Sequence, residues 1–278
     1  MSGNRGLVLN NKALVWLKDA TNVTVVGGKA KALSSMIHGG FKVPEGFVLS
    51  ADAYDVMNPD LDAALLDAFD SLGASFVAVR SSAINEDGVN AAWAGQLDTF
   101  LNCSRLDLVL KVKRCLKSAE TARAKAYALQ RGIETTAVAV IVQEMIDSDV
   151  SGVAFSRHPI TDAADQVVIE AGFGLGEAIV SGQVTPDTYT VSKRDGQIIG
   201  KHMGIQQRML VRGADGENVW GDLNGRASVQ KLSDEQIIAV CELTRGLEEF
   251  FGYPVDVEWA TKNGTIHILQ CRPITTGK

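Results

Sequence analysis

Apolar and polar residues alternate most regularly near the C-terminus, over residues 254–273. The pattern predicts two β-strands joined by a turn at residues 262–264, Lys-Asn-Gly. A two-residue Asn-Gly turn would place Glu258 opposite Leu269 and mix polar with apolar side chains on each face. A three-residue turn with its glycine in the left-handed conformation places Glu258 opposite Ile268 and keeps the faces separate. We expect the second register, because a shift by one residue moves every side chain to the other face.

In the expected register Asp256 lies opposite Gln270, and one face of the hairpin is polar throughout. That face carries two carboxylates, an amide and a guanidinium: Asp256, Glu258, Gln270 and Arg272. The other face carries Val255, Val257, Trp259, Leu269 and Cys271. Carboxylate and amide oxygens suit Mg²⁺, which usually completes its shell with water and phosphate oxygens. The alternative interpretation is an ordinary amphipathic hairpin with a solvated polar face.

Upstream, the pattern changes between strand and helix periods. The β-branched run Val23–Val26 predicts a strand that leads into Gly27-Gly28-Lys29, and Ala30–Ile37 predicts a short helix after it. The continuously apolar run Phe76–Val79 predicts a buried strand that delivers Arg80 at its end. These segments predict mixed secondary structure in the N-terminal half.

Two further helices and a second hairpin follow. Leu106–Arg131 predicts a long helix whose lysines and arginines form a solvated face. Thr136–Ile146 and Ser151–Phe155 predict a hairpin, and Asp234–Phe250 predicts a helix with Ser233 as its N-cap. We place a boundary near residue 135, which gives an N-terminal lobe of residues 1–135 and a C-terminal lobe of residues 136–278.

Composition narrows the class of protein. The chain has 278 residues, of which 46% are hydrophobic and 22% charged, as in ordinary globular proteins. The formal net charge of −6 argues against broad nucleic-acid binding. No apolar run approaches the length of a membrane span, and the N-terminus has no apolar signal segment, so we expect a cytoplasmic protein without membrane contact. The four cysteines show neither metal-type nor disulfide-framework spacing.

Two basic residues of the N-terminal half are candidates for binding an anion. Lys29 follows two glycines at the start of a predicted helix, where backbone N–H groups gather. The motif is not a Walker A loop, since Ala30 stands where that loop has Ser or Thr. The guanidinium of Arg80 suits phosphate oxygens. The alternatives are a solvated Lys29 and a salt bridge from Arg80 to Glu86 or Asp87.

Two glycine-containing segments remain. Residues 83–96 are polar and predict a mobile loop able to close over a ligand. Residues 172–177, Gly-Phe-Gly-Leu-Gly-Glu, match a dinucleotide fingerprint only in part, because Glu177 occupies the place of the third glycine. No regular series of parallel β-α-β units surrounds this segment, so we exclude a Rossmann fold.

Five groups of motifs together resemble the ATP-binding domain shared by phosphoenolpyruvate synthases, pyruvate phosphate dikinases and rifamycin phosphotransferases. They occur in the order of that family and span nearly the whole chain. The groups are Val26–Ala30 with Val43–Phe47; Ala78–Ala83 with Glu86-Asp87 and Ala94–Gln96; Gln143–Met145 with Ser151–Phe155; Gly174–Ala178 with Ser181-Gly182 and Thr185–Asp187; and Asp256–Glu258 with Leu269–Pro273.

The resemblance implies an α+β fold of the ATP-grasp type, in which two lobes hold ATP between them. It implies that Lys29 and Arg80 contact phosphates, that Glu258 and Gln270 bind Mg²⁺, and that Arg272 lies beside the transferred phosphates. It also implies that the backbone of one strand, Gln143-Glu144-Met145-Ile146, recognises adenine. Phosphoryl transfer depends mainly on positioning and on cations that neutralise developing charge, which agrees with this set.

Larger members of the family continue into a swivelling phosphohistidine domain, whereas this sequence ends just after the hairpin. None of its four histidines stands in the phospho-acceptor context of the family. Our leading hypothesis is therefore an ATP- and Mg²⁺-dependent phosphotransferase domain or subunit that phosphorylates a histidine of a partner domain. The AMP product of dikinase-type relatives is implied by resemblance alone.

Two alternatives remain open. One is a self-sufficient ATP-grasp kinase or ligase acting on a small molecule, with Asp256 as the candidate general base. The other is a regulatory module that binds nucleotide without turnover. Lys29, Arg80, Glu258 and Gln270 argue against the second alternative, because binding alone would not need all of these groups.

Overall fold

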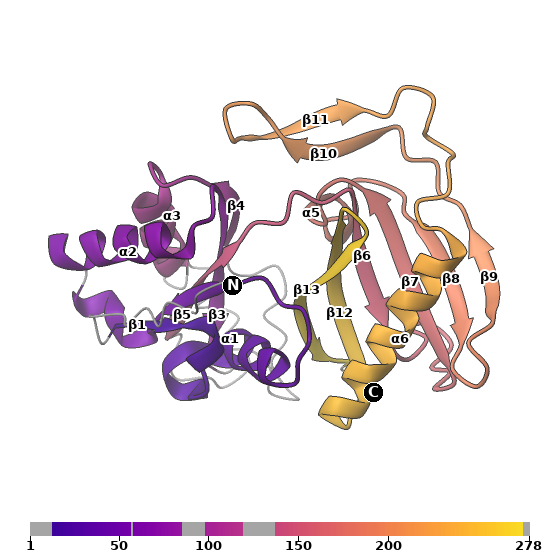
Figure 1. Ribbon diagram of the computed structural model, residues 1–278, viewed down its shortest axis with the longest axis horizontal. Coiled ribbons are helices and arrows are strands. Elements are labelled where there is room, and N and C mark those ends of the chain that lie inside the picture. The colour runs from indigo at the N-terminus through magenta and orange to yellow at the C-terminus, as the bar shows by residue number, and fades with distance from the viewer. Residues whose placement is uncertain (1–12, 57, 85–97, 119–136, 275–278) are drawn as a thin grey trace, which may run out of the picture. The chain divides into compact units, whose positions relative to one another are not determined.

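The computed structural model describes residues 13–56, 58–84, 98–118 and 137–274. The chain divides into two compact units. Unit 1 holds Met1–His38 with Pro44–Met145, and unit 2 holds Gly39–Val43 with Ile146–Lys278. Each unit contains an antiparallel sheet with helices packed on it, which confirms the predicted α+β class (Figure 1).

Unit 1 is built on a five-stranded sheet in the order β1-β2-β5-β3-β4, with all neighbours antiparallel. Its strands are β1 (Leu14–Trp16), β2 (Gly46–Leu49), β3 (Val77–Ala83), β4 (Thr99–Cys103) and β5 (Val138–Glu144). Its helical segments are η1 (Leu17–Asp19), α1 (Val23–His38), η2 (Ala51–Val56), α2 (Pro59–Leu72) and α3 (Leu108–Ser118). Apolar residues of α2, α3 and the sheet form one core, which includes Leu65, Val79 and Val112.

The boundary predicted near residue 135 is wrong, because β5 lies between β2 and β3 inside the sheet of unit 1. The hairpin predicted between this strand and Ser151–Phe155 does not form. The second segment, β6 (Val150–Phe155), pairs with β7 and β12 in the other sheet. An apolar run predicts a strand, but it carries little information on which strand becomes its partner.

The segment Val23–Val26, predicted as a strand, forms the first turn of α1. The side-chain oxygen of Asn22 accepts a hydrogen bond from the backbone N–H of Thr24 at 3.1 Å, which stabilises the start of a helix. The helix is interrupted at Gly27, where φ is 77° and ψ 170°. A Cβ atom at this position would lie 2.2 Å from the carbonyl oxygen of Ser82, so only glycine fits.

Some predicted elements lie outside the described residues. They are most of the loop at 83–96 and the part of the predicted helix Leu106–Arg131 beyond Ser118. Within the described part, α3 confirms the beginning of that helix.

Unit 2 is built on a six-stranded antiparallel sheet in the order β13-β12-β6-β7-β8-β9. Besides β6, its strands are β7 (Gln166–Phe173), β8 (Asp187–Ser192), β9 (Ile198–His202), β12 (Val255–Lys262) and β13 (Thr265–Pro273). The short helix α5 (Glu177–Val180) follows β7, and β10 (Arg208–Arg212) and β11 (Asn218–Asp222) form a separate two-stranded sheet.

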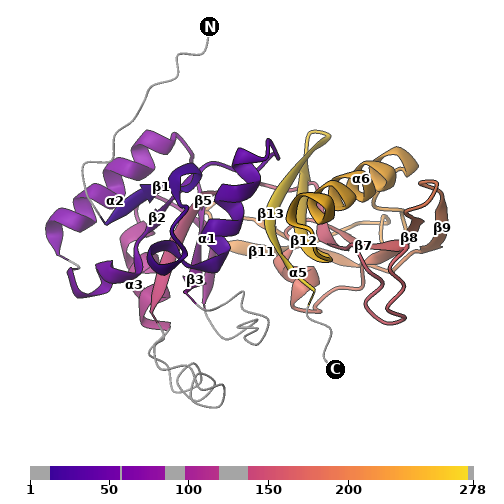
Figure 2. The ribbon, with the colours of Figure 1, turned by 90° about the horizontal axis from the view of Figure 1, so that it is seen from below.

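The helix α6 (Asp234–Phe251) covers one face of the large sheet (Figures 1 and 2). Its predicted N-cap is confirmed: the Ser233 hydroxyl accepts from the Gln236 amide, and the Gln236 side chain accepts from the Ser233 amide. The fully buried side chains of this unit include Trp259, Tyr189 and Ile169. The opposite face of the sheet contains the polar residues of the hairpin.

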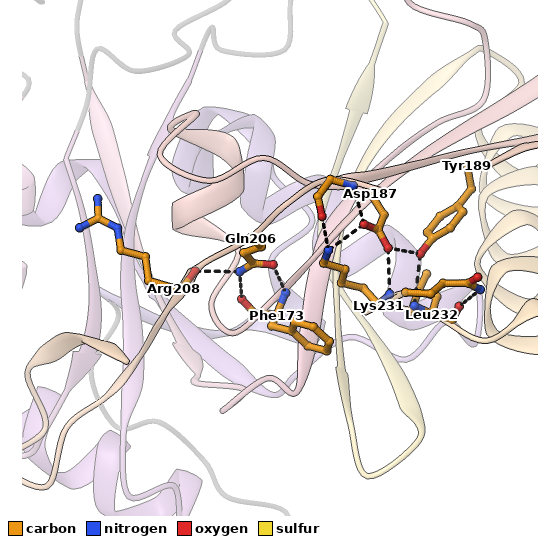
Figure 3. Close-up of polar contacts among 9 residues, drawn as sticks. Phe173, Asp187, Tyr189, Gln206, Arg208, Lys231 and Leu232 are labelled. Atoms are coloured by element: carbon orange, nitrogen blue, oxygen red, sulfur yellow. Dashed lines mark hydrogen bonds and ion pairs between the residues drawn. The ribbon is translucent and has the colours of Figure 1, made fainter. Parts of the chain in front are cut away.

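Residues 203–232, here called the arm, carry β10 and β11 and return to the sheet at both ends. At the first end Gln206 bonds the backbone of Phe173, accepting from its N–H and donating to its carbonyl, both at 2.9 Å. At both ends the arm meets Asp187, whose carboxylate lies in a fully buried network with Lys231 and Tyr189 (Figure 3). β11 was not predicted from the sequence.

Among the described helices, none has the length and apolar character that a membrane crossing requires.

Candidate active site

The hairpin β12–β13 has a different turn from the predicted one. Lys262 pairs with Thr265, so the turn has two residues, Asn263 and Gly264, with φ of 51° and 75°. A β-bulge then shifts the register between Glu258 and Trp259. Asn-Gly is the preferred sequence for a two-residue turn with both residues in the left-handed region, so the sequence contained the correct signal.

The polar face nevertheless has the predicted members. Asp256 pairs with Arg272, and Glu258 pairs with Gln270 instead of Ile268. The observed and predicted registers differ by two residues at these positions, and a shift by two keeps every side chain on its face. Ile268 lies opposite Trp259 and is fully buried.

Asp256 and Arg272 form an ion pair on this face. The Nε atom of Arg272 donates to Oδ2 of Asp256 at 2.8 Å, and Nη2 lies 2.8 Å from the same oxygen. The Asp256 side chain is 11% exposed and the Arg272 side chain 39%. Burial raises the pKa of Asp256, and the Arg272 charge opposes this effect. The carboxylate predicted as a candidate general base is thus already engaged in holding a guanidinium.

Glu258 and Gln270 present a carboxylate and an amide oxygen directly opposite each other. Within the described residues no group of three or more His, Cys, Asp or Glu side chains could enclose a metal ion. A site with one carboxylate and one amide fits Mg²⁺ better than a metal that needs an all-protein cage, because Mg²⁺ keeps waters and binds phosphate oxygens. The donor set therefore fits the predicted metal.

A third carboxylate belongs to the same face and was missed from the sequence. Glu170 of β7 pairs with Val153 of β6, which in turn pairs with Glu258. Partial burial raises the pKa of Glu170, and the neighbouring charge of Asp256 adds to the rise. An acidic residue within the apolar run Val167–Ala171 was the available signal.

In unit 1, Lys29 lies just after the break at Gly27. Its Nζ donates to the carbonyl oxygen of Ser81 at 3.3 Å, and the backbone N–H of Ala30 donates to the hydroxyl of Ser82 at 3.2 Å. The part of α1 that follows the break at Gly27 is therefore attached to β3.

Arg80 lies within β3, not at its end as predicted, because the strand continues to Ala83. Arg80 pairs with Ile141 of β5 and with Thr99 of β4, and its side chain is half-buried. The alternative partners Glu86 and Asp87 lie outside the described residues. Since Lys29 bonds the carbonyl of the residue after Arg80, the two cations belong to one region of unit 1.

The predicted adenine segment falls at the end of unit 1. Gln143 is buried, and its backbone is paired with Gly46 on one side and Ala78 on the other. The backbone of Gln143 is thus paired on both sides within the sheet of unit 1, and its role in adenine recognition stays a prediction. Its side chain donates to the carbonyl oxygen of Pro44 at 3.3 Å.

The next two residues of the segment are also attached to unit 1. The backbone amide of Glu144 donates to the carbonyl oxygen of Glu45 at 2.8 Å, and that of Met145 donates to the carbonyl oxygen of Phe76 at 3.0 Å. Partial burial and the charge of Glu45 raise the pKa of Glu144. Ile146 begins the longer segment of unit 2, and its amide is the next one along the chain after these pairings.

The predicted site residues thus form two groups, each within one unit. The group of unit 1 is Lys29, Arg80, Gln143, Glu144 and Met145, and that of unit 2 is Ile146, Asp256, Glu258, Gln270 and Arg272.

Comparison with known proteins identifies relatives that match more than nine tenths of the chain or close to it. A probable phosphoenolpyruvate synthase of Methanocaldococcus jannaschii is 35% identical, over 96% of this chain and 27% of that protein. The uncharacterized phosphotransferase YvkC of Bacillus subtilis is 34% identical, over 91% of this chain and 34% of that protein. The prodigiosin synthesizing transferase PigC of Serratia marcescens is 34% identical, over 90% of this chain and 32% of that protein. The chain spans about a quarter to a third of the length of these relatives.

Among solved structures, a D-alanine–D-alanine ligase from Bacillus anthracis is similar with a TM-score of 0.39 and 8% identity, over 94% of this chain and 59% of that chain. Residues 55–278 match the family described as pyruvate phosphate dikinase, AMP/ATP-binding domain. This match and the identities above confirm the resemblance drawn from the five groups of motifs. The chain belongs to the AMP/ATP-binding domain family of pyruvate phosphate dikinase.

Proposed function

We propose that this domain binds ATP with Mg²⁺ and passes a phosphoryl group to a histidine of a partner phosphohistidine domain. The proposal is supported by the family to which the chain belongs and by relatives named as phosphoenolpyruvate synthases and phosphotransferases. The observation that carries it is the polar face of β12–β13, where Glu258 lies opposite Gln270 beside the ion pair of Arg272 with Asp256.

Each residue of this face has a separate task in the proposal. Glu258 and Gln270 would hold Mg²⁺, which neutralises phosphate charge when bound. Arg272 contributes a guanidinium to phosphate oxygens, and Asp256 fixes its orientation. Lys29 and Arg80 of unit 1 contribute two further cations. Such a set stabilises developing charge without taking part in covalent chemistry, as phosphoryl transfer requires.

Two of the four histidines of this chain have a ring nitrogen in a local hydrogen bond. The Nδ1 atom of His158 accepts from the amides of Ile160 and Thr161 at 3.2 and 3.3 Å. Nδ1 of His38 shares a hydrogen bond with the carbonyl oxygen of Ser34 at 2.9 Å. In neutral His158 these amides use the lone pair of Nδ1, whereas in His38 the carbonyl oxygen takes a proton from Nδ1 and the lone pair is on Nε2. The assignment of the acceptor to another domain therefore rests on the family and not on these contacts.

In the proposed step, a nitrogen of the partner histidine attacks a phosphorus atom of ATP. The N–P bond forms as the bond from phosphorus to the leaving oxygen breaks, and the imidazole releases a proton to solvent. ADP leaves if the γ-phosphoryl group is transferred. An AMP product places the β-phosphoryl group on the histidine and requires that the γ-phosphoryl group pass to a second acceptor such as water.

Product analysis by ³¹P NMR tests the proposal. The chain is incubated with ATP and Mg²⁺, with and without the phosphohistidine domain of a relative. We expect nucleotide turnover and phosphohistidine only when the acceptor domain is present. Turnover with a small molecule alone would favour the self-sufficient kinase or ligase. ATP binding without turnover under all conditions would favour the regulatory module.

Two variants test the metal site. Glu258→Ala and Gln270→Ala are expected to lower Mg²⁺-dependent ATP turnover, whereas Glu242→Gln provides a matched control. Glu242 is an exposed acid of α6 that pairs with Arg245 at 2.7 Å, on a helix that covers the opposite face of the sheet. Unchanged turnover in the first two variants would contradict the assignment.

A further inference from the structure

The segment Ile146–Asp149 begins the longer part of unit 2, and backbone and hydroxyl contacts attach it to the rest of that unit. The amide of Asp149 donates to the carbonyl of Thr261 at 2.9 Å, and the Asp149 carbonyl accepts from Gly174 at 3.2 Å. The Ser148 hydroxyl donates to the Gly174 carbonyl at 2.8 Å. These contacts hold the segment between the end of β12 and the loop that follows β7.

The two carboxylates of the segment make a second set of contacts. Asp149 accepts from the backbone N–H of Asn263 at 2.9 Å and lies 3.2 Å from Nζ of Lys262. Asp147 lies 3.4 Å from the same Nζ atom and 3.3 Å from Nη2 of Arg212 in β10. Two acids and two bases thus form one group, here called the carboxylate clamp: Asp147, Asp149, Lys262 and Arg212.

The carboxylate clamp joins two parts of the proposed site. Asn263 is the first residue of the turn of β12–β13, the hairpin that carries Glu258 and Gln270. Ile146, directly before Asp147, is the residue of the adenine segment whose amide follows the amides already used within unit 1. The clamp therefore connects the backbone expected to meet the base with the strands expected to hold the metal.

Simple attachment of the segment does not explain the two carboxylates. Ion pairs whose side chains are between a quarter and a half exposed, as these are, contribute little to stability. The backbone bonds already attach Asp149 to the sheet. Recognition of a base by backbone groups, however, depends on placement to a fraction of an ångström, which extra contacts on both sides of a short segment can supply. The Asn263 N–H, followed by Lys262, holds the pKa of Asp149 below its ordinary value, so this carboxylate is charged at neutral pH.

We propose that Asp147 and Asp149 are positioning residues for base recognition: they fix the Ile146 backbone relative to the hairpin of Glu258 and Gln270. This inference rests on the proposed function, since it assumes that the domain binds ATP. It goes beyond that function by naming residues that determine selectivity for the nucleotide base and touch no ligand themselves.

The two carboxylates should affect the binding of ligands that contain a base and not of ligands that lack one. ATP meets both the Ile146 backbone and the metal hairpin, whereas inorganic tripolyphosphate meets only the phosphate and metal groups. Removal of a carboxylate of the clamp is therefore expected to weaken the binding of ATP and to leave the binding of tripolyphosphate unchanged. It is also expected to narrow the preference for ATP over GTP.

The experiment is isothermal titration calorimetry with Mg²⁺-ATP, Mg²⁺-GTP and Mg²⁺-tripolyphosphate. For Asp147→Ala and Asp149→Ala we expect the Kd for ATP to rise roughly tenfold, the equivalent of one lost hydrogen bond, while that for tripolyphosphate stays within about twofold. Asp149→Asn keeps an acceptor for the Asn263 amide and should restore part of the loss. Glu242→Ala is the matched control, because it removes an exposed acid paired with Arg245 at 2.7 Å.

An equal rise in the Kd values for ATP and tripolyphosphate, or no change in either Kd, would overturn the inference. Lys262→Met and Arg212→Met provide a second test that leaves both acids in place, should an alanine variant fail to fold. A wild-type protein that binds neither ligand would instead overturn the proposed function, so the two failures are distinguishable.

Discussion

Unit 2 contains two pairs of an aspartate with a basic residue whose closest N–O distances are both 2.8 Å: Asp187 with Lys231, and Asp256 with Arg272. In the first pair both side chains are fully buried. In the second pair the arginine is 39% exposed. The shared distance conceals a difference in the number of hydrogen bonds.

The Asp187 carboxylate is surrounded by donors. Oδ1 accepts from the Gly204 amide and the Lys231 ammonium, and Oδ2 accepts from the Lys231 amide and the Tyr189 hydroxyl (Figure 3). The Lys231 ammonium also donates to the Gly204 carbonyl at 2.7 Å. Such a network fixes a fold, and it leaves no surface for a ligand. Asp256 instead uses one oxygen to hold a guanidinium that stays partly exposed, which is the arrangement expected of a binding group.

The largest effect is expected where the buried pair is broken. Lys231→Met would leave the Asp187 carboxylate buried without its countercharge and cost about 3–5 kcal/mol of unfolding free energy. Urea denaturation followed by circular dichroism measures this loss. The double variant Asp187→Asn with Lys231→Met should be less destabilised than the single one. A loss below about 1 kcal/mol in the single variant would show that the two pairs are not different in kind.

The exposed pair should show the opposite balance between stability and activity. Arg272→Met is expected to reduce kcat for ATP turnover about 100-fold, as for other groups that stabilise transition-state charge. Its unfolding free energy should fall by only about 1–2 kcal/mol, because water reaches this side of the pair. Stopped assays of nucleotide products and urea denaturation give the two numbers. A stability loss as large as that of Lys231→Met would remove the distinction.

Tyr189 makes the stability of the buried pair's network dependent on pH. Burial and the hydrogen bond to Asp187 raise the pKa of Tyr189 well above its ordinary value of 10.0. The unfolded chain therefore loses this proton first, and the stability that the hydroxyl contributes is lost as pH rises above 10. Tyr189→Phe should cost about 1–2 kcal/mol at neutral pH and flatten the decline at alkaline pH. Thermal melts between pH 8 and 11 measure both, and an unchanged slope would count against the network.

The smallest effect is expected at a surface pair. Arg157 and Asp162 approach to 2.9 Å, but their side chains are 33% and 61% exposed. Arg157→Ala should change the unfolding free energy by about 0.5 kcal/mol or less. The same denaturation assay provides a baseline for the two pairs above. A larger change would mean that N–O distance, and not burial, determines the contribution of an ion pair here.

The polar face of the hairpin was predictable because side chains alternate along a strand. A register that is wrong by an even number of residues still groups the same side chains on the same face. The predicted register and the true one differ by two residues, so the same four side chains were grouped although Glu258 was given the wrong partner. The bulge was not predictable from binary patterning. It follows from a two-residue turn followed by an extra residue in β13.

Other features depend on tertiary contacts that local patterns do not contain. The run Val23–Val26 has strand composition, yet it forms a helical turn that starts after Asn22 and is interrupted where Gly27 approaches Ser82. The partners of β5 are β2 and β3 of unit 1, whereas a local pattern pointed to β6. Such partners are fixed by packing over long sequence separations.

The bulge in β13 also determines how this part of the chain responds to a change in length. Leu269 is the extra residue of β13 at the bulge, between Gln270 and Ile268, so its deletion would keep Glu258 opposite Gln270 while straightening the strand. Deletion of Cys271, two positions further, would instead turn Arg272 toward the apolar face. Deletion of one residue thus has opposite effects on the polar face at two nearby positions of β13. A relative that is one residue shorter at Leu269 is expected to retain the same four polar side chains on the same face.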